Sequence, residues 1–100
     1  DEGEGAQMTI GEMHQKLLEE ARHPDHALYD AYQGEIFSQI NEVLDEIPEE
    51  AHEHVLPFNF KERKDYIRSR PYQYHSIIQL KALHDEFTKK MASYRIRMNR

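Results

Sequence analysis

The chain contains 100 residues, with 19 acidic and 13 basic side chains and a formal net charge of −6. This length suits one domain with a modest core and leaves no room for a second. Cysteine is absent, which excludes a disulfide framework, a thiolate metal site and a cysteine nucleophile. No apolar run approaches the roughly 18 residues of a membrane-spanning helix, and the first residues do not form a signal peptide. We therefore expect a soluble cytoplasmic protein.

The charges are divided unevenly along the chain. Residues 1–50 hold 14 acidic and 2 basic side chains, a balance of −12, whereas residues 51–100 hold 5 and 11, a balance of +6. Such a difference either draws the two halves together during folding or presents two faces to different partners. The sequence leaves both alternatives open.

The first predicted helix follows a short tail. Residues 1–8 combine like charges with two glycines, so we expect a disordered tail there and a single helical domain over residues 9–100. Thr9 and Glu12 have the spacing of a capping box, and Pro24 disfavours helix in the residue before it. The apolar positions that follow the cap have helical spacing and are Ile10, Met13, Leu17, Leu18 and Ala21. The expected helix spans residues 10–22.

A longer apolar stripe predicts the second helix, which Asp25 can cap and Pro48 ends. The stripe consists of Tyr29, Tyr32, Ile36, Ile40, Val43 and Ile47. Gly34 lies within it and either permits a close helix approach or weakens the middle of the helix.

Residues 48–58 predict a surface connection with one helical turn, which the apolar pair Val55 and Leu56 should pin to the core. Asn59 and Glu62 repeat the spacing of a capping box and predict a short helix over residues 60–69. Phe60 and Ile67 should face inward from this helix.

The last predicted helix runs over residues 71–96, with Pro71 in its first turn. Its apolar seam consists of Ile77, Leu80, Phe87, Met91, Tyr94 and Met98, with His84 in the gap. Glu86 and Lys90 have the spacing of a favourable ion pair along a helix. Since no strand pattern occurs, the predicted class is all-α, an irregular small bundle of three main helices and one short helix.

No catalytic, cofactor-binding or metal-binding residue can be assigned, so we expect no cofactor and no enzyme. Glu20 with His23 and Glu49 with His52 have the Glu-x-x-His spacing of bundled di-iron proteins, but both pairs lie beside prolines at predicted helix ends. A metal-dependent helical enzyme is therefore the least favoured alternative. His84 is better explained as a hydrogen-bonded residue at the core boundary than as a general base.

The segment from Lys61 to His75 interleaves basic residues with tyrosines, a composition that suits an interface or phosphate binding. The structural alternative is that the tyrosine rings are buried and that the Lys and Arg side chains balance the negative charge of the second helix. The candidate partner-binding residues are Arg63, Lys64, Arg68, Arg70, Tyr72 and Tyr74.

Part of this segment carries a family resemblance. Residues 57–67, PFNFKERKDYI, and residues 70–80, RPYQYHSIIQL, resemble the YpoC-like family of small bacterial proteins. The resemblance covers residues 57–80, about a third of the chain, and finds no counterpart in the acidic first half. It implies a cytoplasmic helical protein and supplies no catalytic residues.

The favoured hypothesis is a non-enzymatic helical domain that binds another protein through its basic and aromatic surface. The alternative is nucleic-acid binding through the basic second half, including Arg95, Arg97 and Arg100. Self-association is a further alternative, because the seam of the last helix could pair with its own copy. No membrane partner is expected.

Overall fold

The computed structural model describes residues 8–20 and 22–98, and all structural statements below concern these residues. Its elements are α1 (Ile10–Glu19), α2 (His26–Glu46), the 3₁₀ helix η1 (Glu49–His54), α3 (Phe60–Ser69) and α4 (Tyr74–Met98). The described residues contain no strand, so the predicted all-α class is confirmed. Except for Met8, the predicted tail lies outside the described residues, as does the predicted core residue Ala21.

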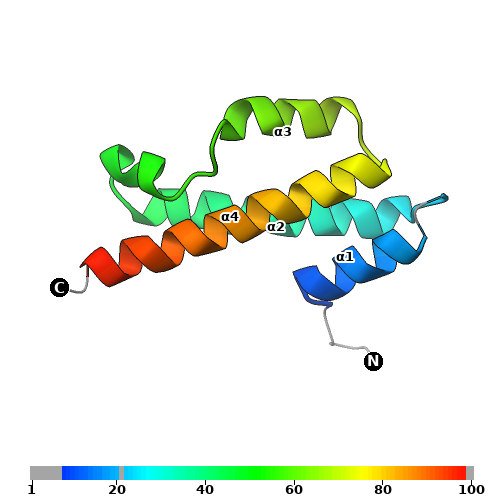
Figure 1. Cartoon of the computed structure of the whole chain (residues 1–100), viewed down its shortest axis with the longest axis horizontal. Coiled ribbons are helices and arrows are strands. Elements are labelled where there is room, and N and C mark those ends of the chain that lie inside the picture. The colour runs from blue at the N-terminus through cyan, green and yellow to red at the C-terminus, as the bar shows by residue number, and fades with distance from the viewer. Residues whose placement is uncertain (1–7, 21, 99–100) are drawn as a thin grey trace.

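The two long helices form the centre of the molecule (Figure 1). α2 and α4 run side by side in the same direction, because η1 and α3 return the chain to the end where α2 begins. α1 lies on one side of this pair and α3 on the other. The molecule measures 45 × 33 × 18 Å, and its shortest dimension is close to two helix diameters, so the bundle is flat.

The apolar stripes predicted from the sequence build the core. All four α-helices and the segment after η1 contribute residues that are fully buried: Leu17, Tyr29, Tyr32, Ile36, Ile40, Val55, Ile67, Ile77, Leu80 and Leu83. Phe37 and Leu83 are buried although neither belongs to a predicted stripe. Since α4 contacts α1, α2, η1 and α3, a single narrow stripe could not cover all its neighbours.

Two predicted helix caps are confirmed. Thr9 and Glu12 form the reciprocal capping box of α1, with N···O distances of 2.8 and 3.1 Å. Asp25 accepts a hydrogen bond from the Leu28 amide at 3.2 Å and caps α2. α1 ends at Glu19, three residues before the predicted end.

The predicted cap of α3 is wrong, although the helix spans the predicted residues 60–69. Asn59 has left-handed backbone geometry, with φ 52°, and its side chain makes no capping hydrogen bond. Asparagine tolerates this geometry better than most residues. Asn59 therefore serves as the turn residue that redirects the chain into α3.

The predicted start of α4 is also wrong. Pro71 lies before the helix rather than in its first turn, because Tyr72 has a φ of 65° and interrupts helical geometry. A left-handed tyrosine is uncommon and requires other contacts to hold it. At the far end of α4, Met98 is 66% exposed, so the predicted seam is buried as far as Met91 and reaches the core with partly buried Tyr94.

The structure decides between the two explanations of Gly34. This residue is exposed, and a Cβ atom built on it would meet nothing within 4 Å. No helix therefore approaches Gly34 closely, and its remaining effect is the lower helix propensity of glycine.

Candidate functional site

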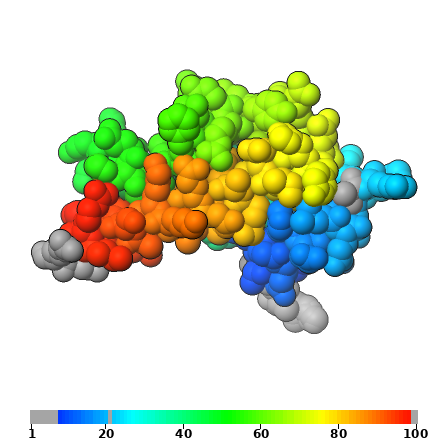
Figure 2. Space-filling view, viewed as in Figure 1, coloured from blue at the N-terminus to red at the C-terminus, as the bar shows by residue number. Residues whose placement is uncertain are grey.

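The predicted partner-binding residues lie on α3, on the turn that joins it to α4 and on the first residue of α4. In the surface view of Figure 2, the yellow-green end of α3 and the yellow beginning of α4 form one continuous surface. The six residues nevertheless have three different environments, and only part of the set faces solvent.

Lys64 and Arg68 lie one turn apart on α3 and approach the aromatic rings beneath it. The Lys64 Nζ atom lies 5.3 Å from the centre of the Phe37 ring and 5.7 Å from that of Phe60. The Arg68 Cζ atom lies 5.7 Å from the Phe37 ring centre. Phe37 belongs to α2 and is buried, so cation–π contacts hold both cations near the α2–α3 boundary.

Arg70 and two tyrosines lie toward the start of α4. The Arg70 Cζ atom lies 5.2 Å from the centre of the Tyr66 ring, and Tyr66 in turn makes an edge contact with His75 at 5.5 Å. Tyr66 and Tyr74 are 42% and 56% exposed. These aromatic groups therefore present their faces or edges to solvent.

Lys64, Arg68 and Arg70 make no ion pair with any carboxylate in the described part of the chain. Ring contacts fix their position without using the charge-assisted hydrogen bonds that ammonium and guanidinium groups can donate. We call the group formed by Lys64, Tyr66, Arg68, Arg70, Tyr74 and His75 the α3 cationic surface.

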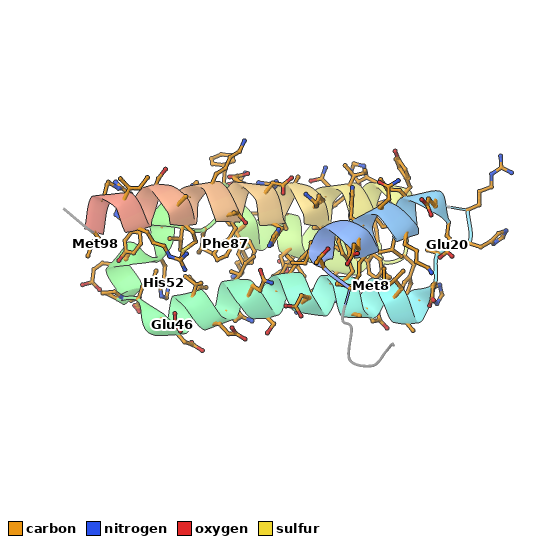
Figure 3. All side chains as sticks on the ribbon, turned by 90° about the horizontal axis from the view of Figure 1, so that it is seen from below. Met8, Glu20, Glu46, His52, Phe87 and Met98 are labelled. Carbon is orange, nitrogen blue, oxygen red and sulfur yellow. The ribbon has the colours of Figure 1, made fainter. Side chains whose placement is uncertain are left out.

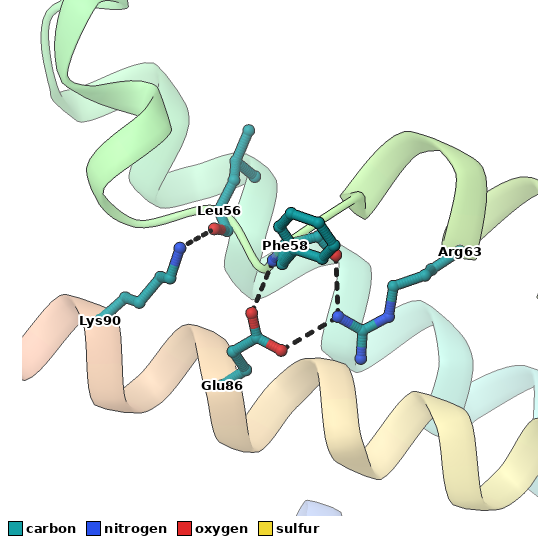
Figure 4. A network of polar contacts seen from close by, with 5 residues as sticks. All are labelled: Leu56, Phe58, Arg63, Glu86 and Lys90. Atoms are coloured by element: carbon teal, nitrogen blue, oxygen red, sulfur yellow. Dashed lines mark hydrogen bonds and ion pairs between the residues drawn. The ribbon is translucent and has the colours of Figure 1, made fainter.

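Arg63 has an internal role instead. Its Nη1 atom lies 3.0 Å from Glu86 Oε1 and donates to the Phe58 carbonyl at 2.8 Å, while Glu86 Oε2 accepts from the Phe58 amide at 2.6 Å (Figure 4). Lys90 donates to the Leu56 carbonyl at 2.9 Å. Glu86 and Lys90 thus bind the η1–α3 connection. The predicted ion pair between the two residues is wrong.

This network changes the titration of Glu86. Partial burial raises the pKa of its carboxyl group, but the hydrogen bonds from Phe58 and Arg63 outweigh that effect and hold the pKa below its ordinary value of 4.5. The ionised form of Glu86 therefore stabilises the junction of α3 with α4.

Tyr72 is also occupied within the fold. Its ring stacks on His26 with centroids 3.8 Å apart and meets Tyr29 edge-on at 4.9 Å. Its hydroxyl donates to Asp30 at 3.1 Å. These contacts with α2 hold the left-handed backbone of Tyr72, so the residue fastens the α3–α4 turn rather than facing a partner.

Two other histidines, His14 and His84, make polar contacts, of which only that of His84 was predicted from the sequence. His14 Nδ1 lies 3.0 Å from the hydroxyl of buried Tyr32, which donates to the Ile77 carbonyl at 3.2 Å. His84 Nε2 lies 3.0 Å from Gln39 Oε1, in the boundary position predicted for it. Burial lowers the pKa of both histidines below the ordinary value of 6.5. Their neutral forms therefore suit the fold.

The Glu-x-x-His pairs do not come together as a metal site. His52 lies 2.8 Å from the Leu44 carbonyl oxygen through its Nε2 atom. Within residues 8–20 and 22–98, no three His, Asp or Glu residues are arranged to hold a metal ion. None of the helices in this part of the chain combines the length and apolar character needed to cross a membrane.

The comparison with protein families extends the resemblance seen in the sequence. The sequence profile of the family described as YpoC-like protein matches residues 30–99. The match therefore covers most of α2, which the sequence resemblance had missed, as well as η1, α3 and α4. Searches of curated proteins and of solved structures found no match. Because the family profile covers more than half of its residues, the chain belongs to the YpoC-like family.

Proposed function

We propose that this protein is a non-enzymatic interaction domain of the cytoplasm, which binds an acidic segment of another protein through the α3 cationic surface. The observation that supports this most directly is that Lys64, Arg68 and Arg70 each lie over an aromatic ring without a carboxylate partner in the described chain. A partner carboxylate can accept hydrogen bonds from these groups while they keep their ring contacts.

The exposed tyrosines add a second reason. Tyr66 and Tyr74 supply apolar area with few rotatable bonds, and tyrosine and arginine are both enriched among residues that dominate binding energy at protein interfaces. Arg63 and Tyr72 do not belong to the proposed contact, because the fold already uses their polar groups and rings.

An acidic peptide suits this surface better than a nucleic acid. The α3 cationic surface is short, and exposed Glu62 and Asp65 lie on the same helix. A peptide can confine its carboxylates to the three cations, whereas a nucleic acid strand carries a charge at every phosphate and would extend over these acidic residues. The net charge of −6 adds to that repulsion.

The test compares capture of partners by three forms of the full chain. One form is the wild type, and the second replaces Lys64, Arg68 and Arg70 by Gln. A control form removes the same charge by replacing Lys16, Arg22 and Lys89, which are exposed outside this surface. Bound proteins are quantified by mass spectrometry after affinity purification with and without nuclease.

We expect the wild type and the control to retain the same acidic partner and the triple variant to lose it by on the order of tenfold or more, since each charged hydrogen bond contributes about 1.5–3 kcal/mol. Circular dichroism should show equal helicity in all three forms. Equal capture by the triple variant would contradict the proposal. Loss of capture after nuclease treatment, with a gel shift that weakens steeply with salt, would show nucleic-acid binding instead.

A further inference from the structure

A groove of about 410 Å³ lies between the second halves of α2 and α4. Its floor is apolar and is formed by Val43 from α2 and by Phe87, Met91 and Ala92 from α4. In Figure 3, the side chain of Phe87 lies between the two helices on the face of the molecule that also carries α1. The groove is therefore on the side of the α2–α4 pair opposite α3 (Figure 1).

The structure already contains a helix bound to this face of α2 and α4. α1 packs on it through Ile10, Met13 and Leu17, which are buried and spaced by three and four residues. The hollows beside Ile10 share Gln39 and Thr88 with the open groove, so the groove continues beyond the first residue of α1. α1 thus shows which ridge of side chains this face accepts, and it fills only part of the face.

α1 and the groove differ in their relation to the family. The family profile matches residues 30–99, so it includes every residue that lines the open groove and excludes α1. Within the described structure, the matched segment supplies no helix for this face of α2 and α4. The one helix bound there comes from outside the matched segment, as a partner helix would.

The walls of the open groove carry opposite charges. α2 contains no Lys or Arg, and its wall carries Glu42 and Glu46. The segment of α4 from Phe87 to Met98 contains no Asp or Glu, and its wall carries Arg95. Neither Glu46 nor Arg95 forms an ion pair within the described part of the chain. Both walls are therefore available to charged side chains of an occupant.

We propose that the open half of the groove binds an amphipathic helix of another protein, in line with α1. The partner helix places an apolar ridge with the spacing found in α1 on the groove floor. Its basic residues lie against Glu42 and Glu46, and its acidic residues lie against Arg95. The partner helix is thus defined by one apolar ridge between two flanks of opposite charge.

The dimensions of the groove suit a short helix. It extends along α2 from Gln39 to Glu46, about 10 Å, which corresponds to two turns of a partner helix. Met98 follows Met91 by seven residues and therefore lies on the same face of α4. Since Met98 is 66% exposed, a further turn of the partner finds apolar surface there. Methionine side chains are flexible enough to adapt to a ridge of different shape.

This site is separate from the α3 cationic surface. Phe37, which underlies α3, and Gln39, which lines the groove, are two residues apart and project to opposite sides of α2. The helix proposed here and an acidic segment on α3 can therefore bind at the same time. The test of the groove does not depend on what α3 binds.

The first experiment uses three synthetic helical peptides of about 14 residues, or four turns, with the same ridge of Leu spaced by three and four residues. The first peptide carries Lys on one flank of the ridge and Glu on the other. The second has the same composition, with Lys and Glu mixed on both flanks, and the third carries Lys on both flanks. Fluorescence anisotropy measures the affinity of each peptide for the wild-type chain, and amide chemical shifts locate the bound peptide.

We expect the first peptide to bind on the order of tenfold more tightly than the second, because only the first places opposite charges against the two walls. Amide shifts should change mainly within residues 39–46 and 87–98. Equal affinities of the two peptides would overturn the proposal. Shift changes concentrated on α1 or on α3 would also overturn it.

The second experiment reverses the charge of one wall. Arg95→Glu makes both walls acidic, so it should weaken binding of the first peptide by on the order of tenfold and strengthen binding of the third. The matched control is Arg97→Glu, the same reversal at an exposed position of α4 outside the groove, which should leave the preference for the first peptide unchanged. A variant that failed to fold would not gain affinity for the third peptide, so the exchange of preference identifies the wall. An unchanged preference in Arg95→Glu would contradict the proposal.

The third experiment fills the floor of the groove. Ala92→Gln places a larger neutral side chain there and should abolish binding of the first peptide. Ser93→Gln, at the neighbouring exposed position outside the groove, is the control and should bind as the wild type does. Circular dichroism verifies the fold of both variants. Binding that persists in folded Ala92→Gln would place the peptide elsewhere and overturn the proposal.

Other occupants of the groove would give different results. A wild-type chain that dimerises, with dilution shifts confined to the groove residues, would show that a second copy fills the groove. Binding that appears only after deletion of residues 1–7 would show that the N-terminal segment of the chain fills it. Either result overturns the proposal, as does the absence of binding at millimolar peptide.

Discussion

Where α2 and α4 begin, α1 and α3 cover them from both sides, and Tyr29, Tyr32, Ile77 and Leu80 are fully buried. Where the same two helices end, η1 and the connection that follows it lie on one side, and Val43 is half-buried. The first end is closed by apolar packing, whereas the second leaves an apolar groove in contact with solvent. The difference arises because α1 and α3 have 10 residues each, against 21 and 25 in α2 and α4.

Polar contacts of the second half of α4 compensate for part of the apolar packing that is missing at this end. Glu86 and Lys90 bind the backbone of residues 56–58, and His52 lies within hydrogen-bond distance of the end of α2. Such contacts are directional and contribute less net stability than the burial of a large apolar side chain. The open half of the molecule should therefore be the less stable half.

The largest expected effect comes from truncating the closed end. Leu80→Ala should lower the free energy of unfolding by about 2–5 kcal/mol, because it leaves a cavity among fully buried residues. Met91→Ala, on the floor of the open groove, should cost less, since solvent and flexible neighbours can fill the space. Urea unfolding measured at concentrations where the protein is monomeric gives both values. Equal losses would show that the two ends are packed alike.

A smaller effect is expected from the polar junction above α4. Glu86→Gln should lower the free energy of unfolding by about 1 kcal/mol near neutral pH, because it weakens the contacts with Arg63 and the Phe58 amide while the side chain is 33% exposed. Asp85→Asn is the control, since the exposed pair with Lys81 contributes only a few tenths of a kcal/mol.

The pH dependence gives this prediction a second readout. The pKa of Glu86 in the folded protein lies below its ordinary value of 4.5, so its stabilisation is present above pH 4.5 and is lost as the pH falls through the folded value. The difference between wild type and Glu86→Gln should shrink in the same range. A difference that stays constant down to strongly acidic pH would contradict the role assigned to the carboxylate.

The closed end was largely predictable from the sequence because its determinants are local. The capping box of Thr9 and Glu12, the cap at Asp25 and the apolar spacing of α1, α2 and α4 all operate within a few residues. The structural class followed from such signals, whereas the bounds of α3 were right although the cap that predicted them does not form. Phe37 and Leu83 escaped prediction because their burial depends on a second neighbouring helix, which spacing along one helix does not reveal.

The candidate site was predictable only as a set of residue types. Composition located the basic and aromatic segment. Which of its side chains face solvent and which are used within the fold depends on contacts with residues distant in sequence. Arg63 pairs with Glu86, 23 positions later in the chain. The Tyr72 hydroxyl donates a hydrogen bond to Asp30, 42 positions earlier. The left-handed geometry of Tyr72 exists because of these tertiary contacts, so local propensity favoured continuing the helix from Pro71.

The smallest expected effect lies at the boundary between the two halves, where His14 and His84 make their contacts with Tyr32 and Gln39. Burial is the main cause that lowers the pKa of each ring below 6.5, and Lys81 acts in the same direction. An unfolded histidine binds its proton more readily, so stability is complete above pH 6.5 and declines as the pH falls toward the lowered values. Because both rings are only partly buried, water limits the loss of stability.

His14→Gln and His84→Gln retain a polar side chain that does not titrate. Each variant should therefore lose less stability than the wild type as the pH falls below 6.5, as measured by thermal unfolding, while the curves above neutral pH run parallel to the wild type. An unchanged slope in the double variant would show that other groups cause the acid sensitivity.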